Sequence, residues 1–421
     1  MNERRAMRLG YLKRHTGPLM TVGAVSVLGI FATAVFHAVT GRGLGPEAFG
    51  LLAAFLSIVN IAAIGASALQ NSVAVGTARS LAETVEGGGV VRPTRRWDSA
   101  TIEALVLGGV GTLVVVVFAP LLADQLATSA LAIYLAALTI LPSFLFSVAQ
   151  GRLQAVGRAT SVAGWSTSSQ ILRVVLAASA LAAGLGAVSV LLAVLIAITA
   201  AAVAAGWQVR GSHLRTATTA FSSHSIVLIM LTLSFAWLTN IDVMLVRMGT
   251  SESHAGMFAA AAVLGKMILI VPTTLSLYLL PRFVNRQGDR GAMKFGVNVI
   301  LLTVLGSGLV AVLGMTLLRG FLISLFFGAG YTEAADLLPW LALAYLPWAL
   351  AQGLLIRLTA AVSRLALAVL IGAAVIQWVA VRMVLPDLGA TIVVVGVLGV
   401  LVVLSMLVLV SRHSRKMVAA E

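Results

Sequence analysis

Three charged residues lie deep inside long apolar runs: Arg173, Asp242 and Lys266. A charged side chain in hydrocarbon needs water, an opposite charge or a ligand, so such residues mark candidate binding or coupling sites. We expect Arg173 and Lys266 to contact an anionic substrate. Asp242, the only acid that we place within a run, is expected to couple movement of that substrate to a proton or sodium gradient. The alternative for the last two residues is a neutralising Asp242–Lys266 ion pair.

Polar side chains recur at helical spacing in two of these runs. One face of the run 49–75 carries Ser57, Asn60, Ser67 and Asn71, and one face of the run 160–183 carries Ser166, Ser169, Gln170 and Arg173. Spacings of three and four residues place them on one side of a helix. We predict substrate contacts at Asn60, Asn71 and Gln170. The alternative is hydrogen bonding between helices.

Four further polar residues lie towards the ends of runs. Arg152 and Arg158 are predicted to collect an anionic substrate at the cytoplasmic side, although their positions also fit simple membrane topology. Asn240 is a further predicted contact, and it shares a helix face with Arg247 rather than with Asp242. His37 ends the first run and is expected to be an interfacial histidine with satisfied hydrogen bonds.

Cofactor and enzyme signatures are missing from the sequence. It has no cysteine, which excludes thiolate metal sites and cysteine nucleophiles. We find no metal-ligand cluster, no nucleotide-binding loop and no nucleophile–base arrangement. The expectation is therefore a protein that is not an enzyme, has no cofactor, and uses an ion gradient or another protein as its energy source.

The elements that hold these residues must be membrane helices. Hydrophobic residues make up 60% of the 421 residues and charged residues 10%. The mean hydropathy is +1.05. A spanning helix needs about 20 apolar residues. Twelve runs qualify, near 18–39, 49–75, 101–123, 129–150, 160–183, 188–208, 225–247, 255–281, 295–318, 333–356, 362–385 and 388–411.

The net charge of +14 follows the predicted topology. Placing the N-terminus inside puts 22 Lys and Arg residues on the cytoplasmic side and only four outside. The four are Arg42, Arg247, Arg319 and Arg382. This asymmetry is the positive-inside pattern of a multi-pass protein with both termini cytoplasmic. Contact with anionic membrane lipids is expected, and nucleic acid is not.

The chain also contains an internal repeat. The segment Gly43–Ala54 returns 206 residues later as Gly249–Ala260, and both copies join two apolar runs. We therefore predict an N-terminal six-helix bundle (1–208), a cytoplasmic linker (209–224) and a C-terminal six-helix bundle (225–421). The expected fold class is an all-α polytopic membrane protein, its two bundles related by a pseudo-two-fold axis along the membrane normal, since each half contains an even number of spans.

Several segments resemble one family of membrane proteins. The central stretch Asn240–Val246, with Ala255–Ala261 and Leu280-Pro281-Arg282, is similar to the signature of Wzx-type polysaccharide flippases. The turn Arg42–Gly50 fits the same family, as do Gln150-Gly151-Arg152 and Phe327–Tyr331. This family belongs to the superfamily that also holds multidrug (MATE) exporters and the lipid II flippase.

The resemblance implies a V-shaped pair of six-helix bundles around a cationic cavity in the bacterial plasma membrane. The implied activity is alternating-access movement of a polyprenyl-pyrophosphate-linked oligosaccharide from the inner to the outer leaflet, for cell-surface polysaccharide biosynthesis. A polysaccharide polymerase and glycosyltransferases are the expected protein partners. Asn240 and Asp242 lie in the shared signature, whereas Arg173 and Lys266 rest on burial and charge alone.

Two alternatives remain from the sequence. A MATE-type drug/cation antiporter would favour an acid-dominated cavity, which one acid and two bases do not provide. A polyprenyl-linked glycosyltransferase would need an acidic outer loop, and the outer loops here are short with scattered acids.

Overall fold

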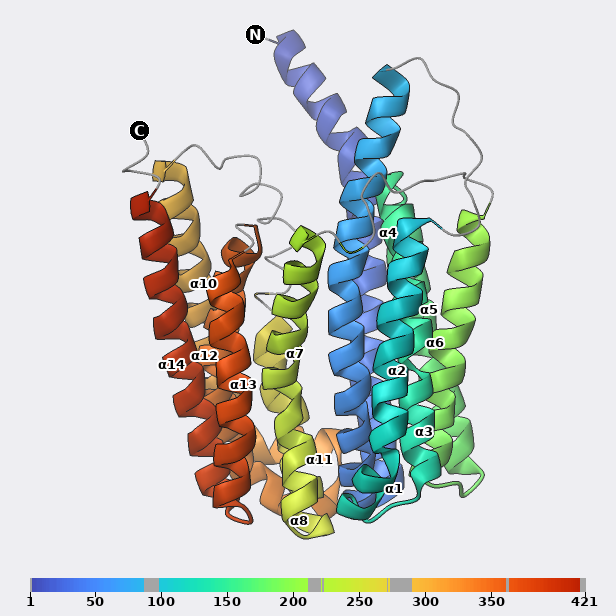
Figure 1. Cartoon of the computed structure of the whole chain (residues 1–421), viewed down its shortest axis with the longest axis vertical. Helices are drawn as coiled ribbons and strands as arrows, with labels where there is room; N and C mark the ends of the chain where they lie inside the picture. The colour runs from blue at the N-terminus through green and yellow to red at the C-terminus, as the bar shows by residue number, and fades with distance from the viewer. Residues whose placement is uncertain are drawn as a thin grey trace. The chain divides into compact units, whose positions relative to one another are not determined.

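The computed structural model describes residues 2–86, 98–210, 221, 223–270, 272, 290–360 and 363–416. These residues form helices joined by short turns, and they contain no strand (Figure 1). The helices are α1 (Asn2–Glu86), α2 (Ser99–Gln125), α3 (Ala130–Leu138), α4 (Ile140–Ala155), α5 (Ala159–Ala182), α6 (Ala187–Val209), α7 (Ser223–Gly249), α8 (Glu252–Gly265), the 3₁₀ helix η1 (Lys266–Leu269), α10 (Arg290–Leu317), α11 (Arg319–Phe326), the 3₁₀ helix η2 (Ala329–Tyr331), α12 (Thr332–Ala360), α13 (Arg364–Val384) and α14 (Leu388–Lys416).

Nine helical stretches in the described part of the chain are long and apolar enough to cross a membrane. The predicted spans coincide with helices where the chain is described, with two interruptions, but α5, which covers the predicted span 160–183, is not among the nine stretches. The span 129–150 is broken at Thr139 between α3 and α4, and the span 255–281 leaves the α-helical form at Lys266. Most of the latter span beyond Ile270 lies outside the described residues, as does most of the predicted linker 209–224.

The long helix α1 contains the first two predicted spans. It breaks at Gly45, whose φ of 73° and ψ of 173° are not helical. A positive φ is accessible to glycine because it has no Cβ. The next residue, Pro46, has no amide hydrogen to donate and starts the second helix without loss. The sequence Gly-Leu-Gly-Pro is therefore the physical reason for the turn between the two spans.

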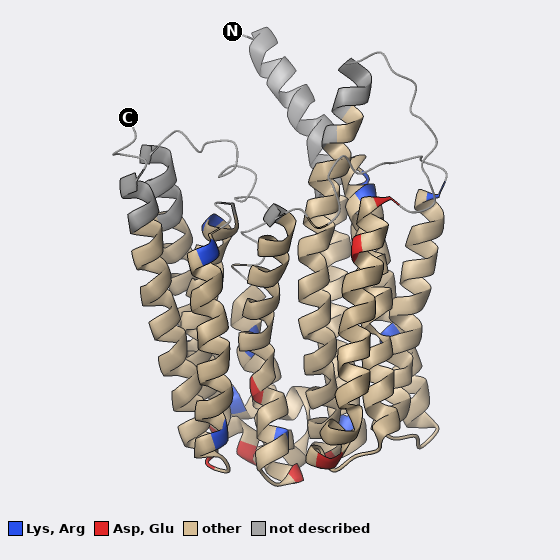
Figure 2. Cartoon of the chain, viewed as in Figure 1, with Lys and Arg blue, Asp and Glu red and all other residues tan. Residues whose placement is uncertain are grey.

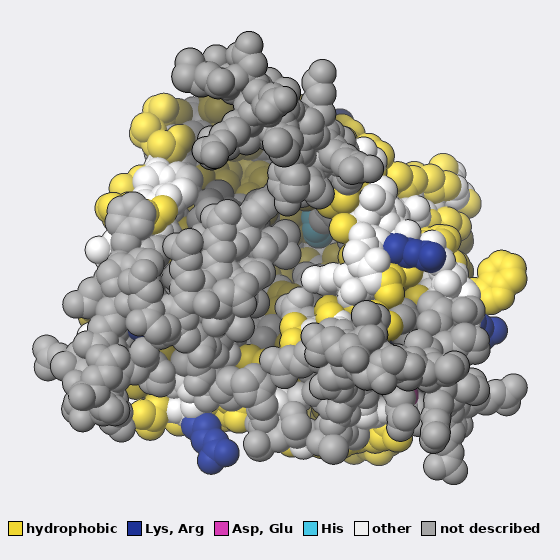
Figure 3. Space-filling model, turned by 90° about the horizontal axis from the view of Figure 1, so that it is seen from above, with side chains coloured by type: hydrophobic (Ala, Val, Ile, Leu, Met, Phe, Trp, Pro, Cys, Tyr) yellow, Lys and Arg dark blue, Asp and Glu magenta, His cyan; other side chains and the backbone are white. Residues whose placement is uncertain are grey.

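Charged side chains are rare along these helices. Figure 2 shows that Lys, Arg, Asp and Glu gather towards the helix ends and leave most of each described helix uncharged. Large apolar side chains face outward instead, including Met383 (79% exposed) and Leu317 (73%). Hydrophobic side chains also reach the rim of the molecule when it is seen from above (Figure 3). Such a surface suits lipid rather than water.

The chain forms two compact units that interleave along the sequence. Unit 1 comprises Met1–Thr40, Ala66–Ala119 and Leu131–Phe221, and unit 2 comprises Gly41–Gly65, Pro120–Ala130 and Ser222–Glu421. The tip of the α1 hairpin and the end of α2 thus cluster with the C-terminal half. The bundle boundaries drawn on the sequence, 1–208 and 225–421, remain a prediction.

Unit 1 packs through small residues. The backbone of Gly108 in α2 lies so close to α4 that an added Cβ would sit 3.0 Å from the Cα of Leu141. The Thr112 hydroxyl donates to the carbonyl of Ala137 (3.2 Å), beside the break between α3 and α4. Small residues and hydroxyl groups are the usual means by which membrane helices associate closely.

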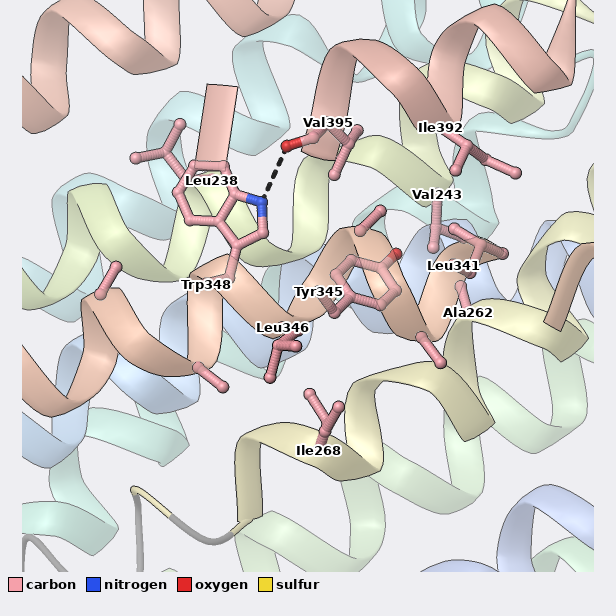
Figure 4. Packing of buried hydrophobic residues seen from close by; sticks show 14 of the residues in the cluster. Leu238, Val243, Ala262, Ile268, Leu341, Tyr345, Leu346, Trp348, Ile392 and Val395 are labelled. Carbon is pink, nitrogen blue, oxygen red and sulfur yellow. Dashed lines mark hydrogen bonds between the residues drawn. The ribbon is translucent and has the colours of Figure 1, made fainter. Parts of the chain in front are cut away.

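Unit 2 is built around α12, which packs against α8, α10 and α14. Tyr345 and Trp348 of α12 are fully buried. Figure 4 shows them close to Ile268 of η1 and Val395 of α14, whose carbonyl accepts the Trp348 indole N–H at 3.0 Å. On the α13 side, the amide of Gln377 donates to the carbonyl of Leu238 in α7 (3.0 Å).

The two copies of the sequence repeat meet inside unit 2. A Cβ added to Gly50 would sit 2.8 Å from the backbone nitrogen of Gly256, the equivalent residue of the second copy. A Cβ added to Gly256 would sit 2.0 Å from the carbonyl oxygen of Pro46. Real Cβ atoms do not approach so closely, so the backbones touch because both positions are glycine.

Further contacts hold the α1 tip within unit 2. Arg42 donates from Nη2 to the carbonyls of Ser324 (3.0 Å) and Leu325 (2.7 Å) at the end of α11. A cation is favoured there by the helix dipole. The Tyr331 hydroxyl donates to the carbonyl of Gly41 at 2.8 Å.

Candidate functional site

An ion pair lies in unit 2 between α7 and the end of α8. The ammonium of Lys266 is 2.9 Å from Oδ1 of Asp242. The Tyr345 hydroxyl donates to the other carboxylate oxygen, Oδ2. The Tyr345 ring also lies beside the ammonium, which is 5.3 Å from the ring centroid. Both oxygens of Asp242 are therefore engaged, and the pair that the sequence left as an alternative is present.

The local sequence places Lys266 at this point. Ser251 caps α8, and its hydroxyl accepts from the backbone N–H of His254 (3.4 Å). The run of Ala and Gly that follows allows close approach to α12, and a Cβ added to Gly265 would sit 3.3 Å from the nitrogen of Ala342. Lys266 comes next, as the first residue of η1. A 3₁₀ segment inside a long helix often marks a hinge or strain.

Burial is unequal within the pair. The Asp242 side chain is 0% exposed and that of Lys266 is 18% exposed. Taking a carboxylate out of hydration is costly unless it is paired and hydrogen-bonded. Lys266 and Tyr345 together supply that compensation.

Arg173 in unit 1 has a different environment. Its guanidinium carbon lies 4.1 Å from the centroid of the buried Phe36 ring. It makes no ion pair with any residue that the structure describes, and its Nε is buried without a hydrogen-bond partner there. A cation on an aromatic face with donors unused is a suitable contact for an anion.

His37 lies next to this arginine site. Its ring packs against that of Phe36 with centroids 5.6 Å apart. Arg173 lies over the same Phe36 ring. The expectation of a satisfied interfacial histidine is wrong for Nδ1, which is buried and has no partner among the described residues.

The remaining polar residues of α5 serve mainly helix packing. Ser166 accepts from Nε2 of Gln150 (2.7 Å), and the Ser169 hydroxyl donates to the carbonyl of Ala197 (3.4 Å). These are the interhelical bonds expected as the alternative to substrate contact. Gln170 is half-buried and makes no hydrogen bond with a described residue.

The asparagines are in three different settings. Asn60 and Asn71 are exposed, the first in unit 2 and the second in unit 1. Asn240 is buried, and its amide donates to the carbonyl of Ala236 (2.9 Å) and to the Thr239 hydroxyl (3.2 Å). Asn240 is thus bound to its own helix, while Asn60 and Asn71 keep their amides at the surface.

Arg152 and Arg158, which were predicted to lie on the cytoplasmic side, differ as well. Nη2 of Arg152 donates to Oδ1 of Asp98 (2.6 Å) and to the Thr101 hydroxyl (2.9 Å). Asp98 also caps α2 by accepting from the backbone N–H of Thr101 (3.0 Å). Arg158, the residue before α5, is exposed. Arg152 is therefore partly neutralised, and Arg158 is the more accessible of the two.

Sequence reasoning missed two residues. Glu103 is a second acid within a span, 4% exposed, and accepts from the backbone N–H of Phe221 (2.6 Å). The prediction that Asp242 is the only acid within a run is therefore wrong, because the predicted run 101–123 itself contains Glu103. Tyr345 gave no signal, since one aromatic residue in an apolar run resembles a packing residue.

The hollows in each unit's surface are apolar. A groove of about 970 Å³ lies on α3 and α6 of unit 1 and includes Leu138 and Trp207. Another of about 360 Å³ lies between α7 and α13 of unit 2 and includes Trp237 and Trp378. Neither contains a predicted site residue. Among the described residues, no three His, Cys, Asp or Glu side chains gather as metal ligands.

Solved structures show the same fold. The chain is similar to an inward-facing multidrug resistance MATE family transporter of the MOP superfamily, with 17% identity and a TM-score of 0.65 over 94% of this chain and 95% of that chain. The eukaryotic MATE transporter AtDTX14 is 12% identical, with a TM-score of 0.67 over 96% of this chain and 98% of that chain. The lipid II flippase MurJ, in its inward closed conformation, is 16% identical, with a TM-score of 0.60 over 93% of this chain and 87% of that chain. The predicted class, an all-α multi-pass membrane protein of two helical bundles, is confirmed.

Sequence comparisons give the family. Comparison with curated proteins finds no match. A family model described as polysaccharide biosynthesis protein matches residues 39–336, which include the α1 turn, Arg173, Asp242 and Lys266. The chain therefore belongs to the polysaccharide biosynthesis protein family.

Proposed function

We propose that the chain is an alternating-access flippase of the bacterial plasma membrane. It moves a polyprenyl-pyrophosphate-linked oligosaccharide from the inner to the outer leaflet, with both termini cytoplasmic. The family membership supports a polysaccharide pathway, and the fold shared with a lipid II flippase supports a lipid-linked substrate. A proton or sodium gradient supplies the energy. Glycosyltransferases act before this step, and a polymerase acts after it.

The observation that carries the proposal is the environment of Arg173. Its guanidinium lies on Phe36 without an acidic partner among the described residues. A membrane-embedded cation with unused donors needs an anion or water. The pyrophosphate of the substrate supplies that anion, with the exposed Arg158 collecting it first.

The remaining predicted contacts enter the proposal according to their exposure. Asn60, Asn71 and Gln170 have amide groups free to contact sugar hydroxyls. Arg152 can contact the substrate once it leaves Asp98, and Lys266 can do so once it leaves Asp242. Asn240 contributes only if α7 changes its local hydrogen bonding.

The direct test is reconstitution of the purified protein in vesicles with fluorescent lipid-linked oligosaccharide. Wild type should expose the glycan on the opposite leaflet, and Arg173→Ala should reduce the rate at least about tenfold at equal protein level. In cells, Arg173→Ala should leave lipid-linked oligosaccharide on the inner leaflet. Normal surface glycan in that variant would remove Arg173 from the site.

The second candidate is the MATE-type drug/cation antiporter, because most of the similar solved structures are MATE transporters. The Asp242–Lys266 pair disfavours it, since the acid that would attract a cationic drug already holds an ammonium. A dye-efflux assay that responds to Asp242→Asn, with glycan unchanged, would favour the antiporter. Glycosyl transfer by the purified protein would favour the enzyme alternative.

A further inference from the structure

We propose that Lys266 is an exchangeable partner of Asp242. Its ammonium leaves the carboxylate for the pyrophosphate of the substrate and returns when the substrate departs, while Asp242 and Tyr345 stay together. This rests on the proposed function and identifies, within it, the residue by which unit 2 senses the headgroup.

Burial shows which partner moves. Asp242 is 0% exposed and its second oxygen is held by the fully buried Tyr345 hydroxyl. The side chain of Lys266 is 18% exposed, and its ammonium lies at the end of a flexible stem of four carbons. The carboxylate is therefore fixed on two sides, whereas the ammonium can swing away without moving a helix.

The backbone at Lys266 favours such movement. The α-helical bonding of α8 ends at Gly265, and Lys266–Leu269 form the 3₁₀ helix η1. The 3₁₀ form has poorer hydrogen-bond geometry than the α form, so it rearranges more easily. Pro272, four residues after Ile268, has no N–H with which to restore an α-helical bond to the Ile268 carbonyl. The Ile268 carbonyl, two residues after Lys266, therefore lacks the α-helical bond that would otherwise stabilise the helix there.

The two ligands of Lys266 compete for one charge. While the ammonium stays on Asp242, the pyrophosphate must break a buried pair in order to bind it. Once the ammonium leaves, Asp242 is a buried carboxylate without a cation, which is strongly unfavourable. The coupling cation predicted for Asp242 would then replace it. Headgroup binding and cation binding thereby become linked, each favouring the other.

A binding experiment tests the competition without transport. The ligand is undecaprenyl pyrophosphate, added to the detergent-purified full chain, with undecaprenol as the ligand that lacks the charge. Asp242→Asn removes the competitor of the pyrophosphate, so its affinity should rise about tenfold. Lys266→Met should lower it about tenfold. A purely structural pair predicts no gain from Asp242→Asn, and that result would overturn the proposal.

A double variant tests the same point by transport. Asp242→Asn/Lys266→Met removes both charges, so it should keep the thermal unfolding midpoint near that of wild type. Exchange predicts that its transport rate falls at least tenfold despite normal folding. Transport at the wild-type rate would show that the pair serves folding alone.

The chain offers a matched control for this variant. Arg247 also forms an ion pair within unit 2, with Nη2 2.7 Å from Oε1 of Glu252, and its side chain is 3% exposed. Arg247→Met/Glu252→Gln should leave pyrophosphate binding and transport within about twofold of wild type. A loss equal to that of the first double variant would mean that removing any such pair impairs the protein, and would overturn the specific role of Lys266.

The proposed function and the exchange fail separately. If wild type binds undecaprenyl pyrophosphate, with affinity raised by Asp242→Asn, but does not move it across vesicles, the flippase proposal fails and the exchange stands. If wild type transports and Asp242→Asn leaves the affinity unchanged, the exchange fails and the flippase proposal stands.

Discussion

Arg173 and Lys266, the two cations predicted to lie deep within apolar runs, have opposite surroundings. Arg173 in unit 1 lies on the Phe36 ring and has no acidic partner among the described residues. Lys266 in unit 2 is bonded to Asp242, whose other oxygen is held by Tyr345. The first has no ion pair that an anion would have to replace, whereas the second can bind an anion only after an existing bond is broken.

This difference assigns the two cations different main roles, anion binding for Arg173 and stability of the fold for Lys266. Removing one member of a buried ion pair is strongly destabilising because its partner is left as an uncompensated charge. An unpaired one is tolerated at a cost and contributes to binding when its ligand arrives. Arginine suits the second role since its charge is permanent and its donors are arranged for phosphate oxygens. The four predictions below test this separation, from the largest expected change in stability to the smallest.

Lys266→Met should lower the free energy of unfolding by about 3–5 kcal/mol, because Asp242 is left buried and charged without its partner. The measurement is an unfolding titration in detergent followed by tryptophan fluorescence. The Asp242→Asn/Lys266→Met variant is the control and should regain most of this loss. If the single and double variants were equally unstable, the ion pair would not explain the effect.

Tyr345→Phe should cost about 1.5–3 kcal/mol, the usual contribution of a hydrogen bond to a charged group. The aromatic ring is retained, so the change reports on the hydroxyl and its bond to Oδ2 of Asp242. The same titration measures it. In the Asp242→Asn background the cost should fall to about 1 kcal/mol or less, because a neutral acceptor gains less from the bond.

Phe36→Leu should cost about 1–2 kcal/mol, because the substitution removes the aromatic face under Arg173 as well as some buried area. Part of that cost should disappear when Arg173 is already methionine. A double-mutant cycle between the two positions measures the coupling directly. Additive effects would show that the ring packs beside the guanidinium without interacting with it.

Arg173→Met should change the free energy of unfolding by less than about 1 kcal/mol, since the relief of an uncompensated charge offsets the lost contact with Phe36. Transport of lipid-linked oligosaccharide should nevertheless fall at least about tenfold. Arg173→Lys keeps the charge and should recover part of the rate. Strong destabilisation by Arg173→Met would place this residue with Lys266 and remove the contrast between the two.

The helices were predictable because hydrocarbon imposes a simple rule on the sequence. A span needs a continuous apolar run, and those runs match the helices of the described chain. The turn at Gly45 was also visible, since Gly-Leu-Gly-Pro is unsuited to a straight helix. Local composition is sufficient for features of this kind.

The site was less predictable because its partners are far apart in the sequence. Asp242 and Lys266 are separated by 24 residues, and Tyr345 lies 103 residues beyond Asp242. Only the packing of α7, η1 and α12 brings them together. Charge inside an apolar run identified two of the three, and only the structure decided that they pair. The unsatisfied Nδ1 of His37 is likewise a property of its surroundings, which the type of residue does not reveal.

The contact between Gly50 and Gly256 has a consequence for how the repeat can evolve. Each glycine belongs to one copy of the repeated turn, and each lies against the backbone of the other copy. After a duplication, two copies are usually free to drift apart. Here a methyl group added to either glycine would occupy space held by the backbone of the other copy. A side chain at either position would therefore require the two turns to move apart, so we expect both positions to remain glycine.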